Sequence, residues 1–122
     1  MSDAPIVYCL TRDRELAAAI DDELTRAIAF FYNDVARLSQ AVTLRVPDLV
    51  VVDTGAVRPE YGDAGLGPIF DLLRRRATGA RLAVRPGLGA EVLVAAEAGR
   101  GVTLLPAERG DCVRDVIGLA RA

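Results

Sequence analysis

The 122-residue chain contains no histidine and no lysine, so all fifteen of its basic residues are arginine. Without histidine, a serine or cysteine nucleophile lacks the base that usually activates it. The two cysteines, Cys9 and Cys112, form no Cys-x-x-Cys motif, and Glu15 stands where a Cys-x5-Arg phosphatase loop starting at Cys9 needs arginine. We therefore expect both cysteines to be small buried side chains in a cytoplasmic protein, and we expect no enzymatic activity.

Long apolar runs are missing as well, since no stretch approaches the roughly 20 residues that span a bilayer. The first five residues have neither the basic nor the apolar region of a signal peptide. The net charge is −2 without a basic tail, which argues against direct electrostatic binding of nucleic acid. With 52% hydrophobic residues, residues 1–122 are expected to form a single folded domain.

Short apolar runs alternate with segments of helical periodicity along the chain. The apolar runs predict five strands, over residues 6–10, 27–32, 49–52, 81–85 and 102–105. Apolar residues at helical spacing predict helices over residues 16–24, 35–42, 69–79, 91–98 and 113–120. The segment from Thr54 to Pro68 contains four glycines and two prolines, which predicts a loop.

Five strand–helix repeats predict an α/β fold in which helices cover both faces of a parallel sheet. The expected architecture is a flavodoxin-like (βα)5 three-layer sandwich with strand order 2-1-3-4-5. In such sheets the ligand crevice lies at the carboxyl ends of the strands, where the strand order reverses. The candidate site therefore contains Leu10, Thr11 and Asp53 from the first and third strands, bordered by Arg85 and Leu105 from the fourth and fifth.

The run Pro47-Asp48-Leu49-Val50-Val51-Val52-Asp53 resembles the third strand of the receiver domain of bacterial response regulators, which ends on a phosphoacceptor aspartate. The resemblance extends over the whole chain in length and in the order of elements. It implies a CheY-like fold and a role in two-component signal transduction and phosphorelay. It also makes Asp53 the phosphoacceptor-equivalent residue.

The other positions of the receiver site depart from that family. Where a receiver carries two acidic Mg²⁺ ligands after its first strand, this chain has Leu10 and Thr11; where the fourth strand ends in Thr or Ser, it has Ala83 to Arg85. Leu105-Pro106 replaces the Lys-Pro pair of the fifth strand, and Val102 replaces its aromatic switch residue. Mg²⁺ needs oxygen ligands, and phosphoryl transfer needs cations. We therefore predict a degenerate pocket, apolar and poor in cations, that binds no metal ion or cofactor and leaves Asp53 unphosphorylated.

Asp53 itself is expected to have a partner, because an unpaired carboxylate among apolar residues would have a raised pKa. The expected partners are backbone N–H groups of the next loop or the guanidinium of Arg85. An atypical receiver, still phosphorylated on Asp53, is the alternative. It would use Arg85 as its cation and Asp13 or Asp63 as a replacement carboxylate.

A second alternative is a pseudo-receiver that senses a nucleotide. Arg74-Arg75-Arg76, with Arg81 nearby, indicates either a solvated helix end or a contact with the phosphate of a small nucleotide ligand. Some degenerate receivers bind a cyclic dinucleotide, so the resemblance allows that ligand. Gly87-Leu88-Gly89 is an incomplete dinucleotide fingerprint and indicates a turn instead.

Three consecutive apolar residues, Val92, Leu93 and Val94, lie in the helix predicted over residues 91–98. A helix that is buried on one face cannot cover all three, so one of them is either at an interface or simply exposed. In receivers, partners and dimers dock on the fourth helix, fifth strand and fifth helix. The resemblance therefore predicts a regulatory pseudo-receiver, free-standing or part of a longer protein, that binds a kinase, an effector domain or a second copy of itself.

Overall fold

The computed structural model describes residues 4–87 and 90–121, apart from the side chains of residues 63 and 91–93. The strands are β1 (Ile6–Leu10), β2 (Ile28–Tyr32), β3 (Leu49–Asp53), β4 (Arg81–Arg85) and β5 (Thr103–Leu104). The α-helices are α1 (Arg14–Glu23), α2 (Val35–Leu44), α3 (Arg58–Tyr61), α4 (Leu66–Arg76), α5 (Glu91–Ala98) and α6 (Arg109–Arg121). Two 3₁₀ helices, η1 (Thr54–Ala56) and η2 (Asp63–Gly65), flank α3.

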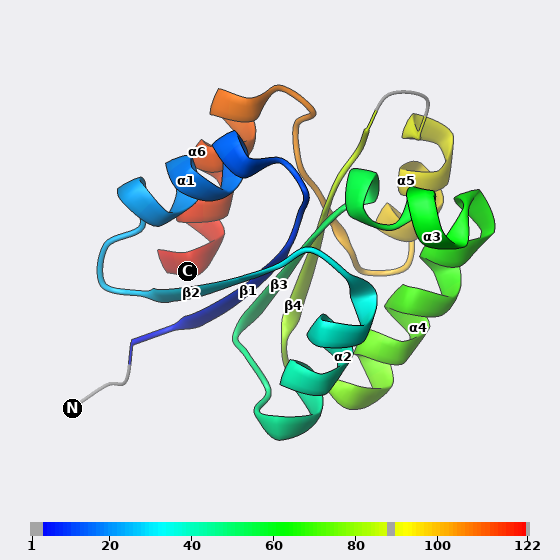
Figure 1. Ribbon diagram of the computed structural model, residues 1–122, viewed down its shortest axis with the longest axis horizontal. Helices are drawn as coiled ribbons and strands as arrows, with labels where there is room; N and C mark the ends of the chain where they lie inside the picture. Colours follow the sequence, from blue (N-terminus) through cyan, green and yellow to red (C-terminus); the bar gives the residue numbers. More distant parts are fainter. Residues whose placement is uncertain (1–3, 88–89, 122) are drawn as a thin grey trace.

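The strands form one parallel sheet in the order β2-β1-β3-β4-β5. Helices α1 and α6 cover one face of this sheet, while α2, α4 and α5 cover the other (Figure 1). The predicted flavodoxin-like, CheY-like (βα)5 fold with strand order 2-1-3-4-5 is therefore confirmed. In the register of the sheet, Asp53 is paired with Arg85 and Leu10 with Val52.

Central strands β1 and β3 are buried at all five of their positions, as expected for strands with helices on both sides. Successive side chains point to opposite faces, so one sheet supports two hydrophobic cores. Phe70 of α4, the largest fully buried side chain among the described residues, belongs to the core beneath α2, α4 and α5. Leu16 of α1 and Val116 of α6 belong to the core on the other face.

The first two helices have aspartate N-caps, Asp13 for α1 and Asp34 for α2. Asp13 accepts hydrogen bonds from the backbone N–H groups of Glu15 and Leu16, both at 3.1 Å. Asp34 accepts one from Arg37 N at 2.8 Å. These bonds satisfy N–H groups that the helices themselves leave free, and they fix Asp13 beside the carboxyl end of β1.

The prediction of a loop from Thr54 to Pro68 was wrong, because this segment contains η1, α3, η2 and the first turn of α4. Pro59 and Pro68 both lie in first turns, where a helix does not need the N–H group that proline lacks. Gly62, at φ 67°, ends α3 in the left-handed region. Glycine and proline therefore separate short helices here, while the buried side chains of Val57 and Leu66 anchor the segment.

Strand β5 is shorter than predicted and consists of Thr103 and Leu104 alone. Its neighbours Val102 and Leu105 are buried, whereas Leu104 is 46% exposed at the edge of the sheet. The last helix begins earlier than predicted, at Arg109, with Glu108 accepting hydrogen bonds from two N–H groups of its first turn. Of the helices that the structure describes, none combines the length and apolar character needed to cross a membrane.

Candidate functional site

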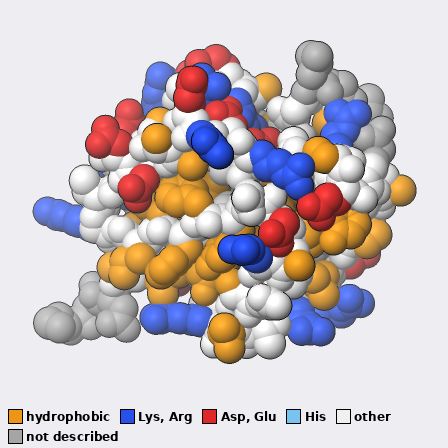
Figure 2. Space-filling view, in the orientation of Figure 1, with side chains coloured by type: hydrophobic (Ala, Val, Ile, Leu, Met, Phe, Trp, Pro, Cys, Tyr) orange, Lys and Arg blue, Asp and Glu red, His pale blue; other side chains and the backbone are white. Residues whose placement is uncertain are grey.

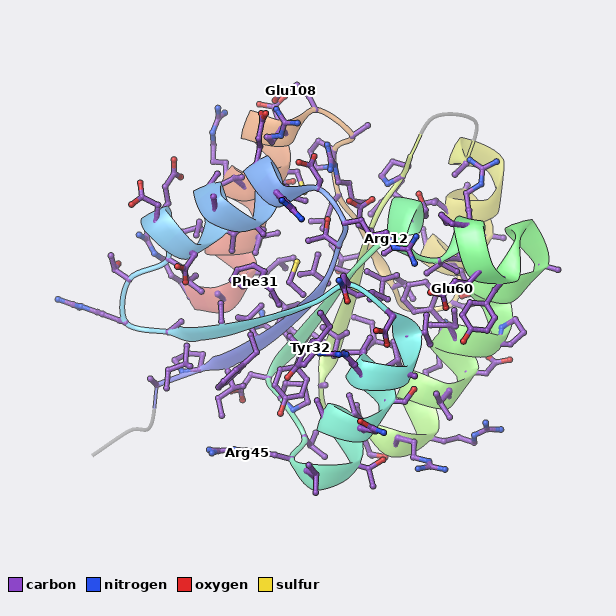
Figure 3. All side chains as sticks on the ribbon, viewed as in Figure 1. Arg12, Phe31, Tyr32, Arg45, Glu60 and Glu108 are labelled. Atoms are coloured by element: carbon purple, nitrogen blue, oxygen red, sulfur yellow. The ribbon has the colours of Figure 1, made fainter. Side chains whose placement is uncertain are left out.

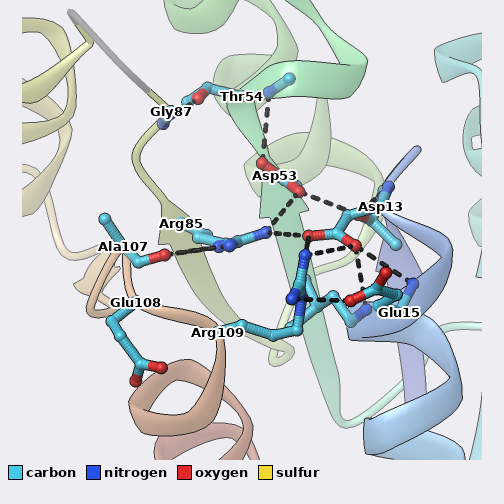
Figure 4. Close-up of polar contacts among 12 residues, drawn as sticks. Asp13, Glu15, Asp53, Thr54, Arg85, Gly87, Ala107, Glu108 and Arg109 are labelled. Atoms are coloured by element: carbon cyan, nitrogen blue, oxygen red, sulfur yellow. Dashed lines mark hydrogen bonds and ion pairs between the residues drawn. The ribbon is translucent and has the colours of Figure 1, made fainter.

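Asp53, the last residue of β3, is 5% exposed and has hydrogen-bond partners on both carboxylate oxygens. Oδ2 accepts a hydrogen bond from Thr11 Oγ1 at 2.8 Å and one from Arg85 Nη1 at 3.2 Å. Oδ1 accepts one from the backbone N–H of Gly55 at 3.2 Å. The two partners predicted for Asp53, the next loop and Arg85, are both present (Figure 4). The carboxylate is therefore fixed in a single orientation by three segments of the chain.

Arg85 joins three parts of the site through one guanidinium. Its Nη1 lies 3.0 Å from Asp13 Oδ2 as well as 3.2 Å from Asp53 Oδ2. Its Nε and Nη2 both donate to the carbonyl of Ala107, at 3.1 and 2.9 Å. Burial disfavours the charged form of Arg85, but the hydrogen bond to Asp13 and the charge of Asp53 outweigh burial and raise the pKa of the guanidinium. The planar fork of arginine suits this bridging geometry, which a lysine ammonium cannot reproduce.

Asp13 is the second carboxylate of the site. Burial disfavours its ionised form, but the hydrogen bond from Leu16 N and the guanidinium groups of Arg85 and Arg109 together hold its pKa below the ordinary value of 3.8. Arg109 Nη2 lies 3.2 Å from Asp13 Oδ2, and Arg109 Nη1 lies 2.8 Å from Glu15 Oε2. The site is therefore an ion-pair network at the carboxyl edge of the sheet.

The network corrects the prediction of a cation-poor pocket, because the guanidinium groups of Arg85 and Arg109 both face Asp13. Arg85 was recognised as a possible cation from its position at the end of β4. Arg109 was missed, since it lies in the first turn of α6 rather than at the end of a strand. The available signal was the short connection between β5 and α6, which keeps the first turn of α6 near the carboxyl edge of the sheet.

The two leucines of the degenerate pocket are buried and belong to the core. Leu10 is fully buried and packs in the core beneath α2 and α4, while Leu105 is 2% exposed and packs in the core beneath α1 and α6. Thr11 is buried, and its hydroxyl both donates to Asp53 and accepts from the N–H of Asp13 at 3.0 Å. These three residues therefore contribute one polar group to the site, the Thr11 hydroxyl.

The residues present do not fit the Mg²⁺ ion that receiver chemistry requires. Mg²⁺ is held by oxygen ligands in near-octahedral geometry. Leu10 supplies no oxygen, and the oxygens of Asp13 and Asp53 already accept hydrogen bonds from two arginines, Thr11 and backbone N–H groups. Across the described part of the chain, no cluster of three or more His, Cys, Asp or Glu residues is arranged to hold a metal ion. Asp63, suggested as a replacement carboxylate, has a side chain outside the described residues.

Thr54 adds a contact that sequence reasoning missed. Its hydroxyl is completely buried and accepts a hydrogen bond from Gly87 N at 2.5 Å. A Cβ on Gly87 would lie 2.9 Å from Thr54 Oγ1, which is closer than real Cβ contacts. Glycine therefore lets the backbone after β4 approach β3 closely. Gly87 is the described member of the Gly-Leu-Gly run, and residues 88 and 89 lie outside the described residues.

Cys9 and Cys112 are free, buried cysteines, as predicted. Burial, reinforced by the nearby Asp53 carboxylate, raises the pKa of Cys9. Burial also raises the pKa of Cys112, to about 11, although the charge of Arg85 opposes the shift. Nucleophilic thiols need a lowered pKa and access to solvent, so neither cysteine is suited to covalent catalysis.

The arginine cluster of α4 is partly used within the protein. Arg74 Nη2 lies 3.0 Å from Glu97 Oε2, and Arg74 Nη1 lies 3.0 Å from Asp71 Oδ1. Arg76 donates to the hydroxyl of Thr43 at 3.1 Å, while Arg75 is exposed at the helix end. Arg74 therefore links α4 to α5, and the three arginines have different surroundings.

The predicted interface run on α5 divides into two parts. Val94 is fully buried in the core beneath α2, α4 and α5, so its side chain is not available to a partner. The side chains of Val92 and Leu93 lie outside the described residues.

Comparison of the chain with known proteins found no matching family model, no matching curated protein and no matching solved structure.

Proposed function

We propose that the chain is a regulatory module of the receiver type that acts through protein–protein interaction without conventional phosphorylation of Asp53. The observation that carries this proposal is the position of Arg85. Its guanidinium bridges Asp53 and Asp13, the two carboxylates at the crevice. A receiver switches when a phosphoryl group and its metal ion change the charge at this point. Here an internal cation already neutralises the carboxylates, so the crevice holds one fixed state.

The ion pairs of Arg85 with Asp53 and Asp13 give the crevice a structural role. Arg85 connects the end of β3 with the loop before α6 through Ala107, so the surface formed by α5, β5 and α6 is held in one arrangement. We propose that this surface binds a kinase or effector domain in the cytoplasm, with no cofactor, no enzymatic activity and no direct contact to nucleic acid. Leu104, which is 46% exposed on β5, would be an apolar contact of that surface.

Incubation with a small phosphodonor and Mg²⁺, followed by intact-mass measurement, tests the proposal. We expect the mass of the chain to be unchanged, because Thr11 and Arg85 both donate hydrogen bonds to Asp53 Oδ2, an oxygen that would attack phosphorus. An Asp53→Ala variant serves as the matched control. A stoichiometric phosphoryl adduct that is absent from Asp53→Ala would overturn the proposal in favour of an atypical receiver.

The binding role has its own test. The chain is used as bait for candidate kinase and effector domains, and the binding measurement is repeated with Leu104→Lys. We expect binding to the wild type and loss of binding to the variant. A partner that binds both proteins equally would show that the α5, β5 and α6 surface is not the docking site.

A further inference from the structure

Strand β2 leaves one edge of the sheet open. Within the described part of the chain it pairs only with β1. Its sequence, Ile28–Tyr32, contains no charged residue and no proline, although proteins usually protect an edge strand with such residues or with a bulge. Ile28 is 48% exposed and Phe30 is 46% exposed, and Figure 2 shows hydrophobic side chains gathered along this strand and below it. The edge therefore has the properties of a strand that pairs with another chain.

The backbone groups at this edge can be assigned. Ile28 N donates to Pro5 O at 2.8 Å, and Tyr32 O accepts from Thr11 N at 2.9 Å, so these residues direct their backbone groups towards β1. Because the direction alternates along a strand, Ala29 and Phe31 direct their N–H and C=O groups to the open side. The side chains alternate between the two faces of the sheet, so Phe31 packs against the core beneath α1 and α6 and Tyr32 against the core on the other face (Figure 3).

We infer that β2 pairs antiparallel with β2 of a second copy of this chain, joining two sheets across a two-fold axis at Phe30. This register follows from overlapping the five residues completely. It places Phe30 opposite Phe30 of the second copy and Ile28 opposite Tyr32. Ala29 then lies opposite Phe31, and the two copies exchange four backbone hydrogen bonds through the groups that point outwards.

The charges flanking β2 are complementary under this symmetry. Arg26 lies two residues before the strand and Asp34 lies two residues after it, so each end of the joined strands brings an arginine beside an aspartate. On the α1 side, Arg14 lines the groove beside Phe31.

The same symmetry gathers apolar surface around Phe30. Leu44 is 88% exposed at the end of α2, and Val46 is 46% exposed in the connection that follows. The ring of Phe30 packs edge-on against Tyr8, with centroids 5.9 Å apart, while the residue remains 46% exposed. An antiparallel pair of phenylalanines at a position without hydrogen bonds places the two rings in close contact. A second copy supplies complementary charge, backbone and apolar groups from one and the same surface, as a two-fold interface requires.

This surface lies at the opposite edge of the sheet from β5, so the inference does not depend on the function proposed above. The two edges offer a matched pair of residues, because Phe30 and Leu104 are both 46% exposed. Sedimentation analysis of the wild type, Phe30→Lys and Leu104→Lys over a dilution series separates the two surfaces. We expect a dimer for the wild type and Leu104→Lys, and a monomer for Phe30→Lys.

Two further variants test the pairing itself. Ala29→Pro removes an outward N–H group without removing a bond to β1, so we expect it to weaken the dimer while preserving the fold measured by circular dichroism. Phe30→Cys places two thiols at facing positions whose Cα atoms are about 4.5 Å apart, within the range that a disulfide bridges. We expect Phe30→Cys to form a cross-linked dimer under mild oxidation, and Ile28→Cys to form none, because Ile28 faces Tyr32 in this register.

Three results would overturn the inference. They are a wild type that remains monomeric at its highest soluble concentration, a dimer that Phe30→Lys leaves intact, and a dimer that Leu104→Lys alone dissociates. The last result would assign self-association to the β5 edge. Cross-linking by Ile28→Cys but not by Phe30→Cys would likewise contradict the proposed register.

Discussion

Arg85 Nη1 lies 3.2 Å from Asp53 Oδ2 and joins the carboxyl ends of β4 and β3. The side chains of these residues are 14% and 8% exposed, so solvent screens the pair only weakly. The pair is part of a larger bridge, since the same guanidinium nitrogen also lies 3.0 Å from Asp13. Arg85 therefore links the ends of β3 and β4 to the N-cap of α1.

Replacing Arg85 by methionine should destabilise the protein by about 2–3 kcal/mol, because it leaves Asp53 buried without its cation. Urea denaturation followed by circular dichroism measures the change. Arg12→Met is the matched control: its ion pair with Glu60 is 41% exposed on both sides, so we expect a loss below about 1 kcal/mol. Equal losses for the two variants would contradict a structural role for Arg85.

Asp13→Asn should lower the free energy of unfolding at neutral pH. As the pH falls, the variant should lose less of this free energy than the wild type does. Because the folded-state pKa of Asp13 lies below the ordinary value of 3.8, its contribution is complete well above pH 3.8. That contribution is lost as the pH falls through the lowered pKa. Asparagine also caps helices, so the variant isolates the charge.

Urea midpoints measured from neutral pH into the acid range check this prediction. Asp34→Asn is the control, since Asp34 also caps a helix but pairs with an arginine that is 73% exposed. We expect its pH profile to follow that of the wild type more closely. Identical profiles for wild type and Asp13→Asn would exclude the proposed charge network.

Arg74→Met should destabilise the protein by about 2 kcal/mol, whereas Arg75→Met should change stability by less than about 0.5 kcal/mol. Arg74 lies 3.0 Å from Glu97, which is 4% exposed and whose other oxygen lies 3.5 Å from Arg100, while Arg75 faces solvent. Thermal or urea unfolding distinguishes the two variants. A larger effect of Arg75→Met would mean that the cluster stabilises the fold in another way.

The thiols of Cys9 and Cys112 should react with a thiol reagent only after the protein unfolds. Both side chains are fully buried, and burial raises the pKa of each, so few thiolates exist in the native state. Absorbance-monitored titration in buffer and in denaturant measures the difference. Rapid reaction of one thiol in the native protein would reveal local opening of the sheet.

Most of the fold could be predicted because its signals are local. The buried strands β1 and β3 are continuous apolar runs, and Asp13 and Asp34 precede helices with apolar residues at regular spacing. The segment from Thr54 to Pro68 was mispredicted, because proline in a first turn and glycine after a last turn resemble a loop when only composition is considered. Helices this short are stabilised by packing, which composition does not report.

The sequence by itself determined the order of the five strands and of the longer helices, the apolar character of positions 10 and 105, and the presence of Asp53 and Arg85 at strand ends that meet. The tertiary structure decided which charges neutralise which. It brought Arg109 to Asp13 across 96 positions of sequence, and it placed the Thr54 hydroxyl against Gly87. Among the residues that the structure describes, it also left one side of β2 without a strand partner. Ion pairs and open edges depend on distances between elements that are remote in sequence, and such distances are set only when the sheet and its helices pack together.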